Sequence, residues 1–158
     1  MYKSQAEAVK EWLKAYRANE ERIDKQLEEV RTLRARMTSV GAQKLSDMPR
    51  SPNAPRDKME NYVIRLESLE LSIEHDVKIQ DECKRTIEQL LLLLDNTEKF
   101  VIRYRYLYGY DWNDVMDSLY RDDKKYRQKI EAYRRRMYRT HERALEKMAR
   151  GWSNHDKS

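Results

Sequence analysis

The sequence predicts an all-α fold, and three observations support this. Charged residues make up 39% of the 158 positions, and the chain contains only three Gly and three Pro. Apolar residues recur over long stretches at the three-and-four spacing of amphipathic helices. High charge with few chain breakers favours long helices over sheet. We therefore expect a long antiparallel helical hairpin, like a coiled coil, followed by a helix-turn-helix with a long basic final helix.

The first expected helix spans about residues 4–37, a stretch without Gly or Pro. Ser4, followed three residues later by Glu7, has the pattern of a capping box. An apolar stripe runs along the helix, with Glu20 and Arg34 as two polar positions within it. The apolar members of the stripe are Val9, Leu13, Tyr16, Ile23, Leu27, Val30 and Met37.

The second expected helix spans about residues 57–95 and begins at Asp57. Residues 38–56 hold all three prolines and form the connection, because proline disfavours helix at the residue before it. Asp76 and Gln80 fall on the heptad seam of this helix. The two stripes fit either a homodimer, in which two hairpins form a four-helix bundle, or a coiled coil without a partner. The apolar seam positions are Met59, Tyr62, Leu66, Leu69, Ile73, Cys83, Ile87, Leu90 and Leu94.

Residues 96–150 are expected to form the helix-turn-helix. Asn96 and Thr97 cap its first short helix, and Gly109 stands where a helix C-terminus favours a left-handed residue. Asp111 then caps a second short helix. Two such short helices bury their apolar faces only against a third element.

That third element is the last helix. The charged segment 120–132 before it forms either a longer turn or an early start of the helix. We expect Gly151 to end the helix and residues 151–158 to form a tail. The expected buried stripe is Ile130, Tyr133, Met137, His141, Ala144, Leu145 and Met148.

Charge is unevenly spread along the chain. Residues 1–96 carry a net charge of −1, residues 97–158 carry +6, and residues 124–150 alone carry eleven basic and three acidic side chains. A basic end on a near-neutral carrier indicates a polyanionic partner, although a merely solvated basic helix fits the charge equally well. Arginine donates hydrogen bonds in pairs to phosphates and to guanine edges. The residues expected to contact duplex DNA are Arg127, Arg134, Arg135, Arg136, Tyr138, Arg139 and Arg143.

A spaced pattern in residues 94–119 resembles region 4, the −35-recognising domain of bacterial sigma factors, and residues 137–145 fit its last helix. Its matching positions are Leu94, Glu98, Phe100, Val101, Ile102, Arg105, Tyr106, Gly109, Trp112, Val115 and Leu119. The chain departs from this pattern at Met116, where a small residue is usual, and it lacks the pattern's Gly-apolar-Ser turn before the last helix.

Residues 46–50 and 57–58 are similar to a family of small phage and prophage proteins that resembles the late-operon activators of the RinA and ArpU kind. This resemblance implies a phage-encoded, sequence-specific transcription regulator in the cytoplasm of a bacterial host. It also implies binding to promoter DNA and a contact with RNA polymerase. No segment resembles the −10-recognising domain of sigma factors, so promoter melting is not expected.

Several function classes are not expected. Cys83 is the sole cysteine, which excludes an intrachain disulfide and a cysteine zinc site. The acidic run 111–117 lacks the glycine and terminal glutamate of a calcium loop, and helix capping explains it better. No catalytic triad and no Gly-rich phosphate loop occur, so we expect no enzyme, no cofactor and no metal.

A membrane association is not expected either. The five leucines at 90–94 fall far short of the ~20 apolar residues that a membrane span needs, and the polar N-terminus gives no signal peptide. The main alternative function is a coiled-coil scaffold or adaptor whose basic end docks on an acidic protein. A helical RNA-binding protein is a third.

Overall fold

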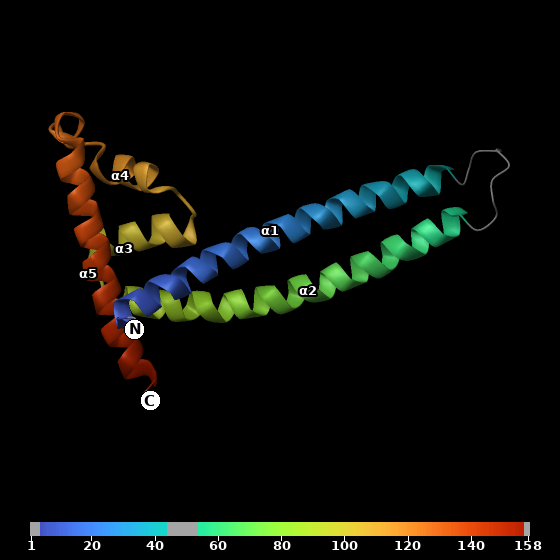
Figure 1. Ribbon diagram of the computed structural model, residues 1–158, viewed down its shortest axis with the longest axis horizontal. Coiled ribbons are helices and arrows are strands. Elements are labelled where there is room, and N and C mark those ends of the chain that lie inside the picture. Colours follow the sequence, from blue (N-terminus) through green and yellow to red (C-terminus); the bar gives the residue numbers. More distant parts are fainter. Residues whose placement is uncertain (1–3, 44–53, 157–158) are drawn as a thin grey trace. The chain divides into compact units, whose positions relative to one another are not determined.

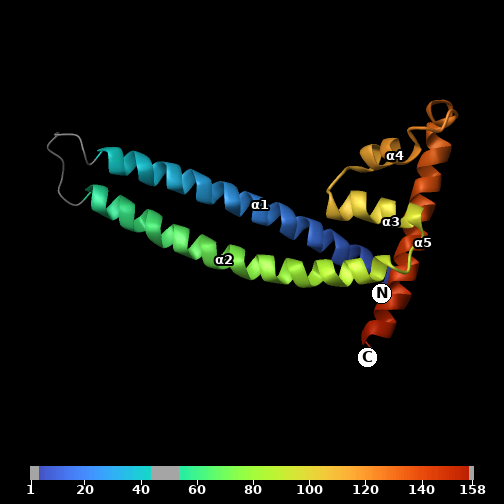
Figure 2. The same ribbon diagram turned by 180° about the vertical axis from the view of Figure 1, so that it is seen from behind.

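The computed structural model describes residues 4–43 and 54–156. Every element in these ranges is a helix and none is a strand, so the all-α prediction is confirmed. The elements, drawn in Figures 1 and 2, are α1 (Gln5–Gln43), α2 (Ala54–Leu91), α3 (Asn96–Ile102), the π-helical turn η1 (Arg103–Leu107), α4 (Trp112–Tyr120), the 3₁₀ turn η2 (Tyr126–Gln128) and α5 (Ile130–Asp156).

The chain divides into two compact units. The paired unit comprises Asn19–Asp81, and the multi-helix unit comprises Met1–Ala18 together with Glu82–Ser158. The core of the multi-helix unit therefore draws on residues from both sides of position 95, where the sequence places a domain boundary.

Helix α1 begins with the predicted capping box. The Ser4 hydroxyl accepts a hydrogen bond from the Glu7 N–H at 3.1 Å, and the Glu7 carboxylate accepts one from the Ser4 N–H at 3.3 Å. The helix then continues to Gln43 instead of ending near residue 37. The buried Val40 continues the apolar stripe into this extra turn, which stabilises the extension.

Helix α2 begins at Ala54, three residues before the predicted start at Asp57. Pro55 is tolerated there because the first turn of a helix needs no backbone N–H from it. The helix ends at Leu91 and not at residue 95, because Asp95 has an extended backbone with ψ 173°. Of the connection predicted at 38–56, residues 38–43 and 54–56 are helical, and 44–53 lie outside the described residues.

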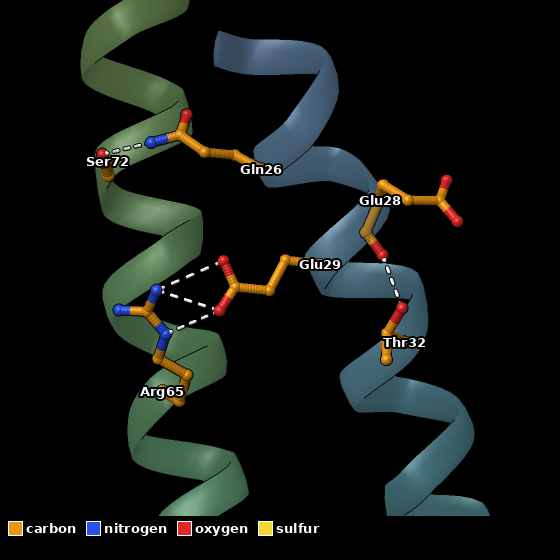
Figure 3. A network of polar contacts seen from close by, with 6 residues as sticks. All are labelled: Gln26, Glu28, Glu29, Thr32, Arg65 and Ser72. Carbon is orange, nitrogen blue, oxygen red and sulfur yellow. Dashed lines mark hydrogen bonds and ion pairs between the residues drawn. The ribbon is translucent and has the colours of Figure 1, made fainter.

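In the paired unit, α1 and α2 run antiparallel, because contacts further along α1 reach earlier positions of α2. Figure 3 shows two of these contacts, one an amide–hydroxyl hydrogen bond of 3.0 Å and the other an ion pair with two hydrogen bonds. Exposed ion pairs of this kind contribute about 0–1 kcal/mol. The cross-helix contacts are Glu20–Gln80, Gln26–Ser72 and Glu29–Arg65.

Two polar residues lie buried on the α2 seam, as the heptad pattern predicts. Asp76 forms an ion pair with Arg22 at 3.1 Å, and the Gln80 amide donates to Glu20 at 3.0 Å. Each partner comes from α1. Because an unpaired polar group is costly to bury, these contacts favour one alignment of the two helices over a shifted one.

The α1 stripe differs from the prediction at two positions. Leu27 is 40% exposed, and the adjacent Gln26 faces α2 instead and donates to Ser72. Arg34 is likewise exposed, whereas the neighbouring Leu33 is buried. At both places the α1 residue that faces α2 lies one position earlier than predicted. A strict heptad count does not predict this shift.

In the multi-helix unit, one apolar cluster joins the start of α1, the end of α2 and α5. A second cluster joins α3, α4, η2 and α5, so both short helices bury apolar side chains against the last one. The first contains Val9, Leu13, Tyr16, Ile87, Leu90, Leu91, Leu94, Ile102, Tyr106, Ala144, Leu145, Met148 and Ala149. The second contains Val101, Val115, Met116, Tyr120, Tyr126, Tyr133 and Met137.

The first short helix is capped by Asp95, one residue before the predicted Asn96 and Thr97. The Asp95 carboxylate accepts from the Glu98 N–H at 2.8 Å, and Glu98 accepts from the Asp95 N–H at 3.0 Å. This reciprocal pair is a capping box.

The turn before α4 matches the prediction. Gly109 has φ +77° and is left-handed, and the Tyr110 N–H after it donates to the Tyr104 carbonyl at 2.9 Å. Asp111 then caps α4 by accepting from the Asp114 N–H at 2.8 Å.

Gly109→Ala is expected to lower the free energy of unfolding by about 1–2 kcal/mol, since a left-handed backbone is unfavourable for a residue with a Cβ. The new Cβ would also lie 3.0 Å from the Arg17 guanidinium. Urea unfolding followed by circular dichroism measures the change. Gly41→Ala is the matched control, because nothing lies within 4 Å of a Cβ there and α1 continues through it. That change should be stabilising by up to about 1 kcal/mol, and equal effects at both glycines would contradict the prediction.

Within segment 120–132, residues 121–129 form the longer turn of the two alternatives, which contains η2, and residues 130–132 already belong to α5. Gly151 does not end α5, which continues to Asp156, so residues 151–156 are helical instead of a tail. Gly151 lies close to two leucine side chains instead. A Cβ there would overlap the Leu93 side chain and lie 3.0 Å from a methyl of Leu90.

Candidate nucleic-acid interface

One side of α5 carries a row of exposed arginines, here called the arginine face: Arg135, Arg136, Arg139 and Arg143. Positions 135, 139 and 143 follow one another at four-residue intervals and so lie above one another on the helix surface. The opposite side holds the fully buried Met137, Leu145 and Met148. The buried stripe thus leaves the arginine face in solvent, as the periodicity predicts, while Ile130 at the start of the stripe is exposed.

The guanidinium groups of the arginine face have few partners. Within residues 4–43 and 54–156, none of the four forms a salt bridge. Arg135 donates to the Glu131 carbonyl at 3.4 Å, Arg143 donates to the Thr140 hydroxyl at 3.3 Å, and Arg136 lies 5.9 Å from the Tyr120 ring centroid. Since each guanidinium has five N–H donors, most donors remain available.

Three further predicted DNA-contacting residues lie elsewhere. Arg134 is half-buried and pairs with Glu131 at 2.5 Å, so it is turned away from the arginine face. Arg127 is exposed but belongs to η2 and not to α5. Tyr138 is 40% exposed and packs its ring edge-on against Trp112 at 5.4 Å, beside the arginine face.

An aromatic cluster supports the start of α5. The rings of Tyr120 and Tyr133 lie 4.9 Å apart, and Tyr126 is 5.6 Å from Tyr133. The Tyr126 hydroxyl donates to Asp117 of α4, and burial, followed by this hydrogen bond, raises the pKa of Tyr126 to about 12. The phenol therefore keeps its proton, and with it this hydrogen bond, to a higher pH than an ordinary tyrosine does. The sequence suggests Tyr126 and Tyr133 as phosphate contacts among the basic residues, but both are buried in this cluster. Tyr120 was missed, since a charged segment gives no periodic signal.

A buried carboxylate connects α3 to the middle of α5. Glu98 is 1% exposed and forms an ion pair with Lys147 at 2.5 Å, while it also accepts from the Asp95 N–H. Lys147 is therefore held by an ion pair to α3 and is not part of the arginine face. The three-residue spacing of Asp95 and Glu98 in the sequence indicates the capping box. It does not indicate the ion pair, because Lys147 lies 49 residues from Glu98.

No protein-family model, curated protein or solved structure matches this chain. Among the described residues, no group of three or more His, Cys, Asp or Glu side chains is placed to hold a metal ion. In the same part of the chain, no helix combines the length and the apolar character that crossing a membrane requires.

Proposed function

We propose that this protein is a sequence-specific regulator of transcription that binds duplex DNA through the arginine face of α5. One observation carries the proposal. Four exposed guanidinium groups without carboxylate partners in the described residues gather on one side of a helix whose other side is buried.

The dimensions and chemistry suit a major groove. An α-helix with its side chains is about 10–12 Å across, and the groove is about 12 Å wide. Guanidinium groups bind phosphate oxygens and the paired acceptors of guanine. We assign base contacts to Arg135 and Arg139, because they line one groove on α5, whereas the Arg136 guanidinium lies over the Tyr120 ring of α4. Arg136, Tyr138 and Arg143 then contact the backbone, with Arg127 as an outlying phosphate contact.

The finer architecture is part of the proposal. We interpret α3, the Gly109 turn and α4, packed on α5, as a helix-turn-helix of the sigma region 4 kind, carried by the hairpin of α1 and α2. The resemblance noted in the sequence extends this to a phage-encoded regulator that acts in the bacterial cytoplasm and contacts host RNA polymerase.

A homodimer through the hairpin also remains a proposal. Ile64 and Leu71 are 64% and 68% exposed, and they lie on the side of α2 opposite the seam. A second copy of the hairpin would remove both from water. Sedimentation equilibrium of the purified chain gives its mass directly, and a monomer at every concentration would reject the dimer.

The DNA proposal predicts strongly salt-dependent binding. If about six phosphates are contacted, affinity for duplex DNA falls by about 10³-fold between 50 and 200 mM salt, because bound counterions are released. A gel-shift titration across this range measures the slope. A protein that binds no duplex even at the lowest salt would refute the proposal.

The rival function uses the same arginines. An adaptor would dock them on an acidic protein, and the long paired helices of α1 and α2 are suited to a scaffold. Such a protein would purify with a 260/280 nm absorbance ratio typical of protein alone and would prefer an acidic polypeptide to duplex DNA in competition. Preference for stem-loop RNA in the same competition would indicate the third class.

A further inference from the structure

A polar pocket of about 250 Å³ lies in the multi-helix unit, and three cationic side chains line it. Lys10 and Lys14 come from α1, and Arg105 comes from η1. Tyr138 and Glu142 of α5 line both this pocket and the groove beside the arginine face. The pocket therefore adjoins the proposed DNA surface without using the arginines that form it.

The charges in the pocket are unbalanced. Lys10 and Lys14 stand one helical turn apart, and like charges at this spacing destabilise a helix. Neither lysine nor Arg105 forms a salt bridge within the described residues. Glu142 supplies the negative charge in the lining, so the lining carries a net charge of about +2, and Glu11 of α1 acts on the lining residue Tyr106 as a second acid. A bound anion would relieve this repulsion.

Hydrogen bonds and ring contacts hold the side chains that line the pocket. His141 is 4% exposed, and its Nε2 lies 2.8 Å from the hydroxyl of the buried Tyr106. Arg105 donates to the Tyr110 carbonyl at 3.0 Å and lies over the Trp112 ring at 4.9 Å, which holds its guanidinium in place. Such pre-ordered groups lose little conformational entropy when a ligand binds.

We propose that this pocket binds a phosphate group, with Lys10, Lys14 and Arg105 as its cationic ligands. Ammonium and guanidinium donors from two elements suit a tetrahedral oxyanion better than a planar apolar ligand. The phosphate belongs either to the DNA backbone beside the arginine face or to a free phosphorylated molecule. The site itself does not depend on duplex binding.

The test uses His141 as a built-in reporter. Its pKa is lowered to about 4 by burial and by the nearby Lys10, Arg105 and Lys14. At the acidic pH where His141 titrates, inorganic phosphate is a monoanion. Its negative charge in the pocket would favour the imidazolium form and raise the pKa of His141 by about one unit. Inorganic phosphate is titrated into the full-length protein at constant ionic strength, with chloride as the control anion, and the imidazole signals are followed by NMR. Signals of the three histidines are assigned with single His→Gln variants.

The expected result is a saturable shift of the His141 signal with phosphate and none with chloride. The double variant Lys10→Gln/Lys14→Gln should weaken this binding by about tenfold or more, since it removes two charge-assisted contacts. Lys25→Gln/Lys78→Gln, at exposed lysines of the paired unit, is the matched control and should bind as the parent does. No saturable shift, or an equal shift in the pocket variant, would overturn the proposal.

A second arm identifies the source of the phosphate. If the DNA backbone supplies it, Lys10→Gln/Lys14→Gln also weakens binding of a short duplex and lowers the salt slope by about two. If a free molecule supplies it, duplex affinity is unchanged while a nucleoside monophosphate loses its binding. A chain that binds phosphate but no duplex at all refutes the DNA function and leaves the pocket assignment intact.

Discussion

Replacing Arg135 and Arg139 together with alanine is expected to weaken duplex binding by about 2–6 kcal/mol, or roughly 30-fold to more than 10⁴-fold. Both side chains are exposed, stand one turn apart on α5 and lack carboxylate partners within the described residues. Their loss therefore removes donors from the DNA without leaving a buried group unpaired. Fluorescence anisotropy of a labelled duplex at one fixed salt concentration measures the change.

The control for this experiment is Arg36→Ala/Arg85→Ala, which removes the same charge from exposed arginines of α1 and α2. It should change affinity by no more than a general loss of charge does, about twofold to fivefold. Unchanged circular dichroism in both variants shows that folding is intact. Equal losses in the two variants would mean that net charge, and not the arginine face, attracts the DNA.

Acidification is expected to destabilise the multi-helix unit through His141. Burial and three nearby cations hold the pKa of His141 at about 4, below its ordinary value of 6.5, and Glu142 is the acid that lines the same pocket. The unfolded chain thus binds a proton in the range between these values while the folded chain does not. The stabilisation is complete above pH 6.5, falls as the pH drops towards 4, and loses about 3 kcal/mol in all.

Urea unfolding at pH 7 and pH 4.5 measures this loss, and His141→Gln isolates it. Glutamine keeps a polar group near the Tyr106 hydroxyl but does not titrate, so the variant is less stable at pH 7 and shows a smaller drop on acidification. His75→Gln, at an exposed histidine, should behave as the parent does. A pH dependence that His141→Gln leaves unchanged would disprove the role of His141.

Helix caps and turns that depend on neighbouring residues could be predicted from the sequence. Ser4 with Glu7, the left-handed Gly109 and the Asp111 cap each rest on contacts within a few residues, and all three were predicted at the right positions. Asp95 was missed because the chain leaves the helix at residue 92, which five consecutive leucines do not indicate. Gly151 looks like a helix end, yet α5 continues through it and places it beside Leu93, a neighbour that only the folded chain reveals.

In the candidate site, too, local features could be predicted from the sequence and tertiary contacts could not. The arginine face follows from the spacing of α5 alone, because one stripe of that helix is apolar. The pairing of Arg134 with Glu131 is also local, but whether it withdraws the guanidinium from solvent depends on burial. The pocket lined by Lys10, Lys14 and Arg105 could not be predicted from the sequence, since Lys10 and Arg105 are far apart in the chain and meet only in the tertiary structure.

Because the multi-helix unit has a shared core, its C-terminal helices should not fold as a separate domain. Leu145 and Met148 of α5 are buried in one apolar cluster with Val9 and Leu13 from α1 and Ile87 from α2. A fragment cut at residue 96 would leave these side chains facing water and should aggregate instead of folding. Recombination would then have to exchange residues 5–18 together with the last helix, and a fusion protein carrying only residues 97–158 would not inherit the proposed DNA binding.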